Sequence, residues 1–234
     1  MPLPKEEHDI RKVSAKQKVY EMLKKWIIEG QLRPGEKISD GDIAALFHVS
    51  RTPVREALLQ LEMQKLVKSY PGRSTVVSEL EYENIEKWYA PMACLQQLAV
   101  GMAVENAGEA NIARLKELNE RFAAEVREKN DVLNIFEADR EFHSYIIEMS
   151  GNEYILDFCN TLWIHVQRLE YCFFKDGTSL EESISDHEQM IKAFERKDGF
   201  TAGLKMKNNW ERTVVQIQSM NHLKTSSCPG NTKE

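Results

Sequence analysis

The fold of the first third of the chain is decided by the stretch Ser39-Asp-Gly-Asp-Ile-Ala-Ala-Leu-Phe-His-Val-Ser-Arg-Thr-Pro-Val-Arg-Glu-Ala-Leu58. Ser39 and Asp42 have the three-residue spacing of a capping box, and the apolar positions 43, 44, 46 and 47 then give a short helix one buried face. His48-Val49 is predicted to form a turn, after which Ser50 can cap a second helix. The stretch therefore predicts two short helices joined by a tight turn.

The second predicted helix divides into an apolar side and a basic start. Its inward-facing residues recur at helical spacing: Val54, Ala57, Leu58 and Leu61. Arg51, Thr52 and Arg55 fall on the other side, in the first turn and a half. A helix-turn-helix lays this part of its second helix in the DNA major groove, where arginine reads guanine and threonine contacts phosphate or thymine. We therefore predict DNA contacts from Ser50, Arg51, Thr52 and Arg55.

The flanking sequence agrees with a winged helix-turn-helix. Residues 14–29 form an amphipathic helix that Gly30 ends, and a Pro-Gly pair turns the chain at 34–35. After the second helix, residues 66–70 and 74–78 are typical of a small hairpin. Its tip carries Gly72 and Arg73, which we expect to touch the minor groove or the phosphates. A solvated helix pair with incidental arginines does not account for all these features in sequence.

These residues resemble the GntR family of bacterial transcription regulators. The resemblance is carried by Gly30-Gln-Leu-Arg-Pro-Gly35 and Val49-Ser-Arg-Thr-Pro-Val-Arg-Glu-Ala-Leu58 and covers about the first 80 residues. It implies that Arg51, Thr52, Arg55 and the wing tip contact DNA. This chain departs from the family at Gly41, where a polar or basic residue often reaches DNA.

Composition allows two domains of ordinary size and shows where the charge lies. The 234 residues carry a formal net charge of −6, which argues against a protein that coats nucleic acid indiscriminately. Residues 1–80 nevertheless hold 14 Lys and Arg against 11 Asp and Glu, while residues 81–234 hold 17 against 26. The basic part is thus the part with the DNA-binding motif. No apolar run is long enough for a membrane helix, and the four cysteines lack metal or disulfide spacing, so we expect a cytoplasmic protein with idle thiols.

The remainder of the chain predicts a mainly α second domain. We expect a winged helix-turn-helix over residues 10–79, an antiparallel six-helix bundle over 82–223 and a flexible tail over 224–234. The six helical stretches, separated by Gly, Asn or Asp, are expected at 81–107, 110–129, 131–150, 152–174, 179–197 and 199–223.

A second group of polar residues falls inside this bundle. Asp139 and His143 are four residues apart and therefore share one helix face. His187 follows two helices later. Two histidines and a carboxylate suit a divalent zinc, nickel or manganese ion. A simple hydrogen-bonded Asp139–His143 pair is the alternative that the residues alone leave open.

This part resembles the all-helical FCD domain of FadR-subgroup GntR regulators, and its six helices are closer to the VanR-like branch. The resemblance implies that Asp139, His143 and His187 bind a metal that helps hold a small carboxylate effector. Asn209 stands where a third histidine is expected, Met92 where an effector-binding arginine is common, and Gln96 where a glutamate is common. These departures imply either a less acidic effector or a pocket whose polarity comes from Arg168, Gln167 or His165. His165 is also a candidate to complete the metal site.

Together these observations predict a metabolite-responsive transcription regulator, with repression the expected sign. It would bind a pseudo-palindromic double-stranded DNA operator as a homodimer, with its DNA affinity modulated by a small-molecule effector of the organic-acid class. One alternative is a ligand-independent DNA-binding protein whose bundle only dimerises. The other is a metal-dependent enzyme, which we do not expect because the paired Glu-x-x-His motifs of di-iron bundles are missing.

Overall fold

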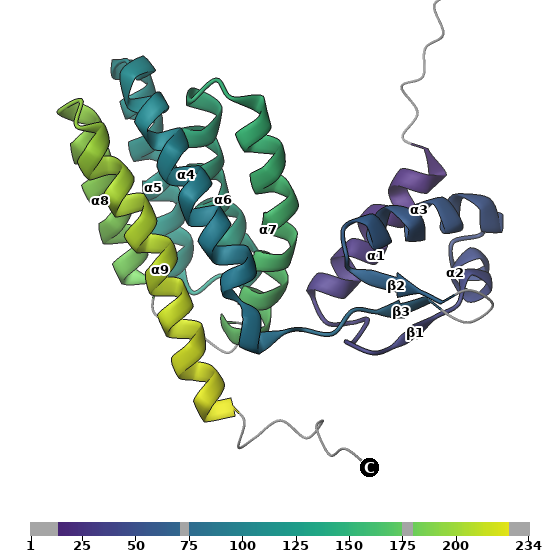
Figure 1. Cartoon of the computed structure of the whole chain (residues 1–234). Helices are drawn as coiled ribbons and strands as arrows, with labels where there is room; N and C mark the ends of the chain where they lie inside the picture. Colours follow the sequence, from purple (N-terminus) through teal and green to yellow (C-terminus); the bar gives the residue numbers. More distant parts are fainter. Residues whose placement is uncertain (1–13, 71–74, 175–179, 225–234) are drawn as a thin grey trace, which may run out of the picture. The chain divides into compact units, whose positions relative to one another are not determined.

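The structure is a computed structural model that describes residues 14–70, 75–174 and 180–224. The chain divides into two compact units, with the boundary in the sequence between Glu79 and Leu80. We describe each unit by itself (Figure 1). Among the described residues, no helix combines the length and the apolar content that a membrane span requires.

The first unit is a winged helix-turn-helix, as predicted. It contains the helices α1 (Ala15–Ile28), α2 (Asp40–Leu46) and α3 (Arg51–Met63) and the strands β1 (Lys37–Ile38), β2 (Val67–Ser69) and β3 (Thr75–Val77). The strands form an antiparallel sheet in the order β1-β3-β2. The hairpin of β2 and β3 was predicted. Strand β1 was not, because two residues are too few to show an alternating pattern.

Local signals in the sequence fix these helices. The side chain of Ser14 accepts a hydrogen bond from the Gln17 backbone and begins α1, and Ser39 does the same for Asp42 in α2. His48 makes the turn with a φ of 53°, a left-handed conformation. The apolar face of α3 packs on α1, and the rings of Trp26 and Phe47 stack at 5.5 Å.

Two expectations about this unit need correction. Leu46 was expected to face inward, yet 61% of it is exposed, because α2 ends there and its buried residues are Ile43 and Ala44. Ser50 occupies the N-cap position of α3, but its side chain makes no capping hydrogen bond.

The second unit contains the six long helices of the predicted bundle. They are α4 (Glu86–Asn106), α5 (Glu109–Glu128), α6 (Val132–Met149), α7 (Glu153–Phe174), α8 (Glu181–Glu195) and α9 (Gly199–Lys224). The first begins five residues later than expected, after a short 3-10 turn at Tyr82–Asn84. Lys129 ends α5 in a left-handed conformation, and the Asp131 side chain caps α6.

The core of this unit is apolar except at its centre. Helix α4 packs against α6, α7 and α9, while α5 packs against α6 and α8 (Figure 1). Phe142, Trp163 and Trp210 are large members of the buried cluster. Among them lie the buried polar side chains of Gln96, Asn119, His143, His187 and Asn209. Three cysteines (Cys94, Cys159 and Cys172) are free thiols, and Cys228 lies outside the described residues.

Candidate DNA-binding surface and metal centre

The predicted DNA-binding side chains of α3 lie on the surface. Arg51, Thr52 and Arg55 are exposed, and Ser50 immediately before them is exposed as well. The opposite face of the helix is held in the core by Val54 and Leu61, neither of which is exposed at all. The start of α3 therefore presents two guanidinium groups and two hydroxyls on a rigid support. Gly72 and Arg73 of the wing tip lie outside the described residues.

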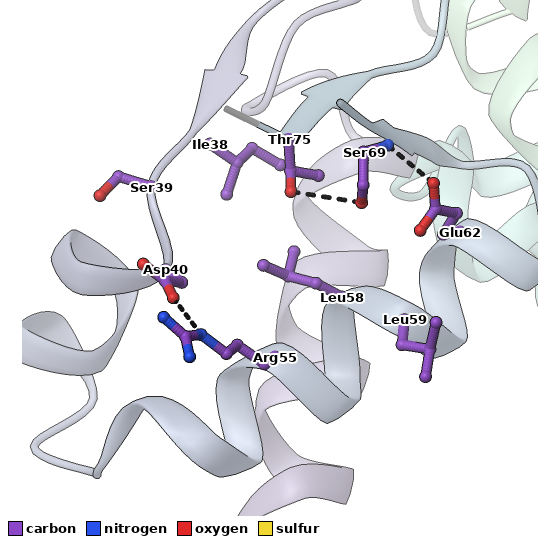
Figure 2. A pocket seen from close by; sticks show the side chains of 9 residues that line it. All are labelled: Ile38, Ser39, Asp40, Arg55, Leu58, Leu59, Glu62, Ser69 and Thr75. Atoms are coloured by element: carbon purple, nitrogen blue, oxygen red, sulfur yellow. Dashed lines mark hydrogen bonds and ion pairs between the residues drawn. The ribbon is translucent and has the colours of Figure 1, made fainter. Parts of the chain in front are cut away.

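A carboxylate on α2 orients one of these arginines. The Arg55 Nε donates to the Asp40 Oδ2 at 2.5 Å, and Figure 2 shows the side chain reaching from α3 across to the start of α2. The Arg55 hydrogen bond holds the pKa of Asp40 below its usual value, with a further contribution from Arg51. Because the bond uses Nε, the two terminal nitrogens of Arg55 stay available for a bidentate contact with guanine.

Gly41 leaves room for the guanidinium group of Arg51. A Cβ atom at position 41 would lie 3.1 Å from the Arg51 Nη2. The guanidinium of Arg51 therefore lies next to the space that a side chain at position 41 would occupy. A larger residue at this position would displace Arg51. Glycine at position 41 therefore leaves room for the position that Arg51 has in this structure.

The wing is tied to the far end of the same helix. The Ser69 backbone N–H of β2 donates to the Glu62 Oε1 at 2.7 Å, and the hydroxyls of Ser69 and Thr75 face each other across β2 and β3 at 3.5 Å (Figure 2). These residues line one side of an open groove whose other side includes Asp40 and Arg55. The helix and the wing are therefore positioned together.

In the second unit, three predicted metal ligands lie together at the centre of the bundle. The Nε2 atoms of His143 and His187 are 3.3 Å apart. Asp139 approaches them with Oδ2 3.7 Å from His143 and Oδ1 3.5 Å from His187. The ligand atoms of this group all lie within 4.8 Å of one another. Helix α6 contributes two of the residues, because positions 139 and 143 share one face, and α8 contributes the third.

Buried amides determine which nitrogen of each imidazole carries the proton. The Gln96 Oε1 accepts the Nε1–H of Trp210 at 3.0 Å and lies 2.7 Å from the Nδ1 of His143. The Asn119 Nδ2 donates to the Ile184 carbonyl at 3.4 Å, which turns its Oδ1 toward the Nδ1 of His187 at 3.0 Å. Since indole N–H is only a donor and a carbonyl is only an acceptor, both amide orientations are fixed. Both histidines therefore carry their proton on Nδ1.

This assignment leaves two bare Nε2 lone pairs facing each other beside a carboxylate. A hydrogen bond between them would require a proton on one Nε2, and that histidine would then point a bare Nδ1 at an amide oxygen. A divalent cation satisfies all three groups at once. Two nitrogens bound to one tetrahedral zinc at about 2.0–2.1 Å are roughly 3.3 Å apart, which is the separation observed here. The residues present therefore fit a metal ion.

The electrostatics of the group agree with this fit. Burial lowers the pKa of His143 to about 3 and lowers the pKa of His187 well below its usual value, so both imidazoles are neutral at pH 7, as ligands must be. Burial raises the pKa of Asp139 to about 7. Phe142 stacks on the His187 ring at 3.9 Å and holds its plane.

A small cavity lies beside this group. Its volume is about 20 Å³, close to the space that one water molecule needs. Asp139 and Asn209 both line it, and the Asn209 Nδ2 donates to the Asp186 Oδ2 at 3.5 Å. Asn209 is therefore next to the site, with an amide in place of an imidazole.

The residues expected to form the effector pocket lie in different surroundings. Gln96 is entirely buried and orients His143, while Met92 lies behind it and accepts a hydrogen bond from the Gln96 Nε2 at 3.2 Å. Arg168 is buried but is not among the described residues that line the cavity. The suggestion that His165 completes the metal site is wrong, because its ring stacks on Trp88 at 5.4 Å and it is not in the ligand group.

Several residues of the site were not predicted. Asn119 and Trp210 fix the tautomers, and Glu170 lines the cavity while accepting a hydrogen bond from Tyr89 at 3.2 Å. A buried acid or amide on a helix looks like a surface residue in sequence.

Known proteins match both units. Residues 15–77 match the family described as bacterial regulatory proteins, gntR family, and residues 89–212 match the FCD domain. The HTH-type transcriptional regulator McbR of Escherichia coli is 28% identical over 191 residues, which are 81% of this chain and 86% of McbR. The regulator YdhC of Bacillus subtilis is 26% identical over 183 residues, 76% of this chain and 80% of YdhC.

Two further comparisons agree. The HTH-type transcriptional repressor RspR of E. coli is 24% identical over 185 residues, 78% of this chain and 80% of RspR. The solved structure of E. coli McbR/YncC has the same fold, with a TM-score of 0.75 at 24% identity, covering 90% of this chain and all of that one. Because the matched domains are those of transcription regulators, the metalloenzyme alternative is set aside. The chain belongs to the GntR family of bacterial transcription regulators and carries a C-terminal FCD domain.

Proposed function

We propose that this regulator is a cytoplasmic homodimeric repressor that binds a pseudo-palindromic operator and is controlled by a small molecule in its helical domain. A single helix-turn-helix reads only a few base pairs, so a two-fold dimer reading two half-sites is the usual source of specificity. Repression is also the activity in the name of RspR, one of the relatives. Contacts from Ser50, Arg51, Thr52 and Arg55, with Gly72 and Arg73 from the wing, would supply the readout.

The observation that carries the sensory part of the proposal is the pair of bare Nε2 atoms of His143 and His187 beside Asp139. The two Nε2 atoms converge without a proton between them, and a divalent cation would engage both of them together with the Asp139 carboxylate. We propose that zinc, nickel or manganese binds there and that the metal offers an open coordination position to an organic-acid effector. Asn209 would then serve as a weaker oxygen ligand or leave its position to water. The effector needs to favour one arrangement of the two DNA-binding heads by only a few kcal/mol to shift operator occupancy.

The test has three parts on the full chain. Elemental analysis after mild purification should find close to one divalent ion per chain. Light scattering should give the mass of a dimer at micromolar concentration. Selection from random double-stranded DNA should return an inverted repeat. A protein purified without metal would contradict the proposed metal-dependent sensing. A monomer bound to a single half-site would contradict the proposed dimer on a pseudo-palindromic operator.

A ligand-independent DNA-binding protein is the second candidate. The volume of about 20 Å³ beside Asp139 favours it, because small organic ligands occupy pockets of about 300 Å³ or more. In that case the bundle would only dimerise. A DNA footprint that no metal or metabolite changes would support this candidate.

A further inference from the structure

The outer face of helices α4 and α9 carries most of the large apolar side chains that the helical unit exposes. Among the described residues of this unit, six such side chains are exposed, and four of them lie on these two helices: Leu98, Phe200, Leu204 and Val215. The other two, Tyr154 and Phe158, lie one turn apart on α7. Exposed apolar side chains that gather on two neighbouring helices are typical of an interaction surface.

The two helices form one continuous surface. They lie side by side (Figure 1), and a Cβ atom at Gly203 of α9 would lie 3.3 Å from the Gln97 Cγ of α4. Because Leu204 and Leu98 each follow one of these two residues in the chain, they lie at the same level along the helix pair. Leu98 is 57% exposed and Leu204 is 41% exposed, so both contribute to the surface.

Along α4 the outward-facing residues recur every three or four positions, which is the spacing of one helix face. Five of them are exposed, and the sixth, Gly101, is partly exposed; in chain order the six are Lys87, Ala90, Cys94, Leu98, Gly101 and Glu105. A Cβ atom at Gly101 would meet no other atom within 4 Å, so the space outside this glycine is open. The middle of this α4 stripe is small or apolar, and its two ends carry opposite charges.

The α4 stripe is complementary to itself. In a two-fold interface residue i of one copy faces residue j of the other, and residue j faces residue i. If α4 lies antiparallel to the same helix of a second copy, with the axis at the level of position 96, Lys87 faces the partner's Glu105 and Cys94 faces the partner's Leu98. Each of these pairs then occurs twice. Lys87 pairs with Glu81 at 2.7 Å within its own chain, yet 58% of its side chain remains exposed.

We propose that the face formed by α4 and α9 joins two copies of this chain, with the two α4 helices antiparallel across the two-fold axis. The inference rests on the proposed homodimer and adds the surface by which it forms. The apolar side chains at the centre would supply the affinity. The opposite charges at the ends of the stripe would fix the direction and register of the two helices.

Leu98→Glu is the first test, with Phe158→Glu as the matched control, because the two side chains are 57% and 61% exposed. Both variants are made in the full chain, and circular dichroism checks that they fold. Sedimentation equilibrium should show that Leu98→Glu raises the dimer dissociation constant by about a hundredfold or more, since both copies place an acid in the apolar centre. Phe158→Glu should associate like the wild type.

Charge reversal tests the direction of the helices. Lys87→Glu and Glu105→Lys should each raise the dissociation constant by about threefold to tenfold at low salt, because each places two pairs of like charges across the axis. The double variant Lys87→Glu/Glu105→Lys should return to nearly the wild-type value. Only an arrangement in which these two positions face each other gives this recovery.

Cross-linking tests the register. Leu98→Cys places a thiol opposite the partner's Cys94, and oxidation with diamide should then join the two chains by a disulfide. The same substitution combined with Cys94→Ser should lose this link, which excludes a link through the other cysteines.

The wild-type mass separates this inference from the proposed function. A wild-type monomer at micromolar concentration would contradict both the proposed homodimer and this interface. A wild-type dimer would leave the proposed function standing, and three results would then overturn the interface alone: association unchanged by Leu98→Glu, association weakened equally by Phe158→Glu, or no recovery in the double charge reversal.

Discussion

The two domains differ in the exposure of the nitrogen-bearing side chains at their functional sites. On the DNA-binding domain, 66% of the Arg55 side chain and 28% of the Asp40 side chain are exposed. In the helical domain, the side chains of His143 and His187 are 1% and 0% exposed. An exposed ion pair contributes little to stability, whereas buried polar groups cost stability until a partner satisfies them. Ligand binding and stability should therefore be coupled strongly in the helical domain and weakly in the DNA-binding domain.

Metal binding gives the largest expected effect. A zinc concentration a thousandfold above the dissociation constant should add about 4 kcal/mol to the free energy of unfolding of the helical domain. Asp139→Asn keeps the shape of a ligand and removes its charge, so most of the zinc-dependent rise in melting temperature should disappear. Asp157→Asn, on the exposed side of α7, should respond like the wild type. If zinc raised the melting temperature of Asp139→Asn as much as that of the wild type, the predicted dependence of stability on zinc binding at Asp139 would be wrong.

The pH dependence of the metal-free protein gives the next effect. Burial raises the pKa of Asp139 to about 7 and, together with the Asp139 charge, raises the pKa of Glu170 to about 8. Between the unfolded and folded pKa values the folded state binds more protons, so the stability from these groups is lost as the pH rises through 7 and 8. With chelator present, the melting temperature should fall from pH 6.5 to pH 8.5, a range in which both buried histidines are neutral.

Glu170→Gln and zinc should each reduce this pH dependence. The variant removes one of the two raised pKa values, and the metal keeps Asp139 ionised throughout the range. A wild-type melting temperature that rises between pH 6.5 and pH 8.5 would show that these two acids do not control it.

The DNA-binding domain should show the reverse pattern, with changes in binding and none in stability. Arg51→Ala or Arg55→Ala should cost about 1–3 kcal/mol of specific DNA binding. Because both side chains are exposed, the melting temperature should hardly change. Arg127→Ala, an exposed arginine of the helical domain, serves as the control in fluorescence anisotropy with the selected DNA. If both α3 variants bound the selected DNA with unchanged affinity, the assignment of the start of α3 as the DNA-recognition surface would be wrong.

The sequence predicted most of the fold because its signals are local. Ser39, Gly30 and Asp131 are caps or breaks that act within a few residues, and the apolar periods of the helices are continuous. Helix ends were correct to within a few residues, apart from the start of α4. The two-residue strand β1 was missed because it forms only by pairing with β3, which follows much later in the chain: Lys37 pairs with Val76, and Ile38 pairs with Thr75.

The sites were predictable only where a motif sits on one helix. The i, i+4 spacing of Asp139 and His143 is visible in sequence, and so is the run of polar residues that begins α3. Asn119 and Glu170 reach the site from α5 and α7, and no local pattern marks them. Gln96 of α4 was noted only through the family resemblance. His165 was misjudged for the same reason, since its position in an apolar run does not say which ring it meets.

A substitution of Asp40 tests whether the exposed ion pair with Arg55 acts on DNA binding by orienting the Arg55 side chain. Asp40→Ala should lower the ratio of specific to non-specific DNA affinity, because Arg55 loses the partner that fixes its Nε and DNA loses a repulsive carboxylate. Non-specific affinity should hold or rise, and the effect should be smaller than that of removing Arg55. A specificity ratio equal to that of the wild type would mean that Arg55 is positioned without Asp40.

Gly41→Ala gives the smallest expected effect. It distinguishes a change in the stability of α2 from a change in the position of Arg51. Alanine favours a helix over glycine by about 0.8–1.0 kcal/mol in a helix interior. Position 41 is the second residue of α2, so we expect only a part of this gain. The alanine Cβ would meet the Arg51 Nη2 at 3.1 Å, and the flexible end of Arg51 must then move by a few tenths of an ångström. We expect a small rise in melting temperature with a small loss of operator affinity, measured together with Gly41→Ala/Arg51→Ala. If the loss persists in the double variant relative to Arg51→Ala, position 41 acts on DNA by a route other than Arg51.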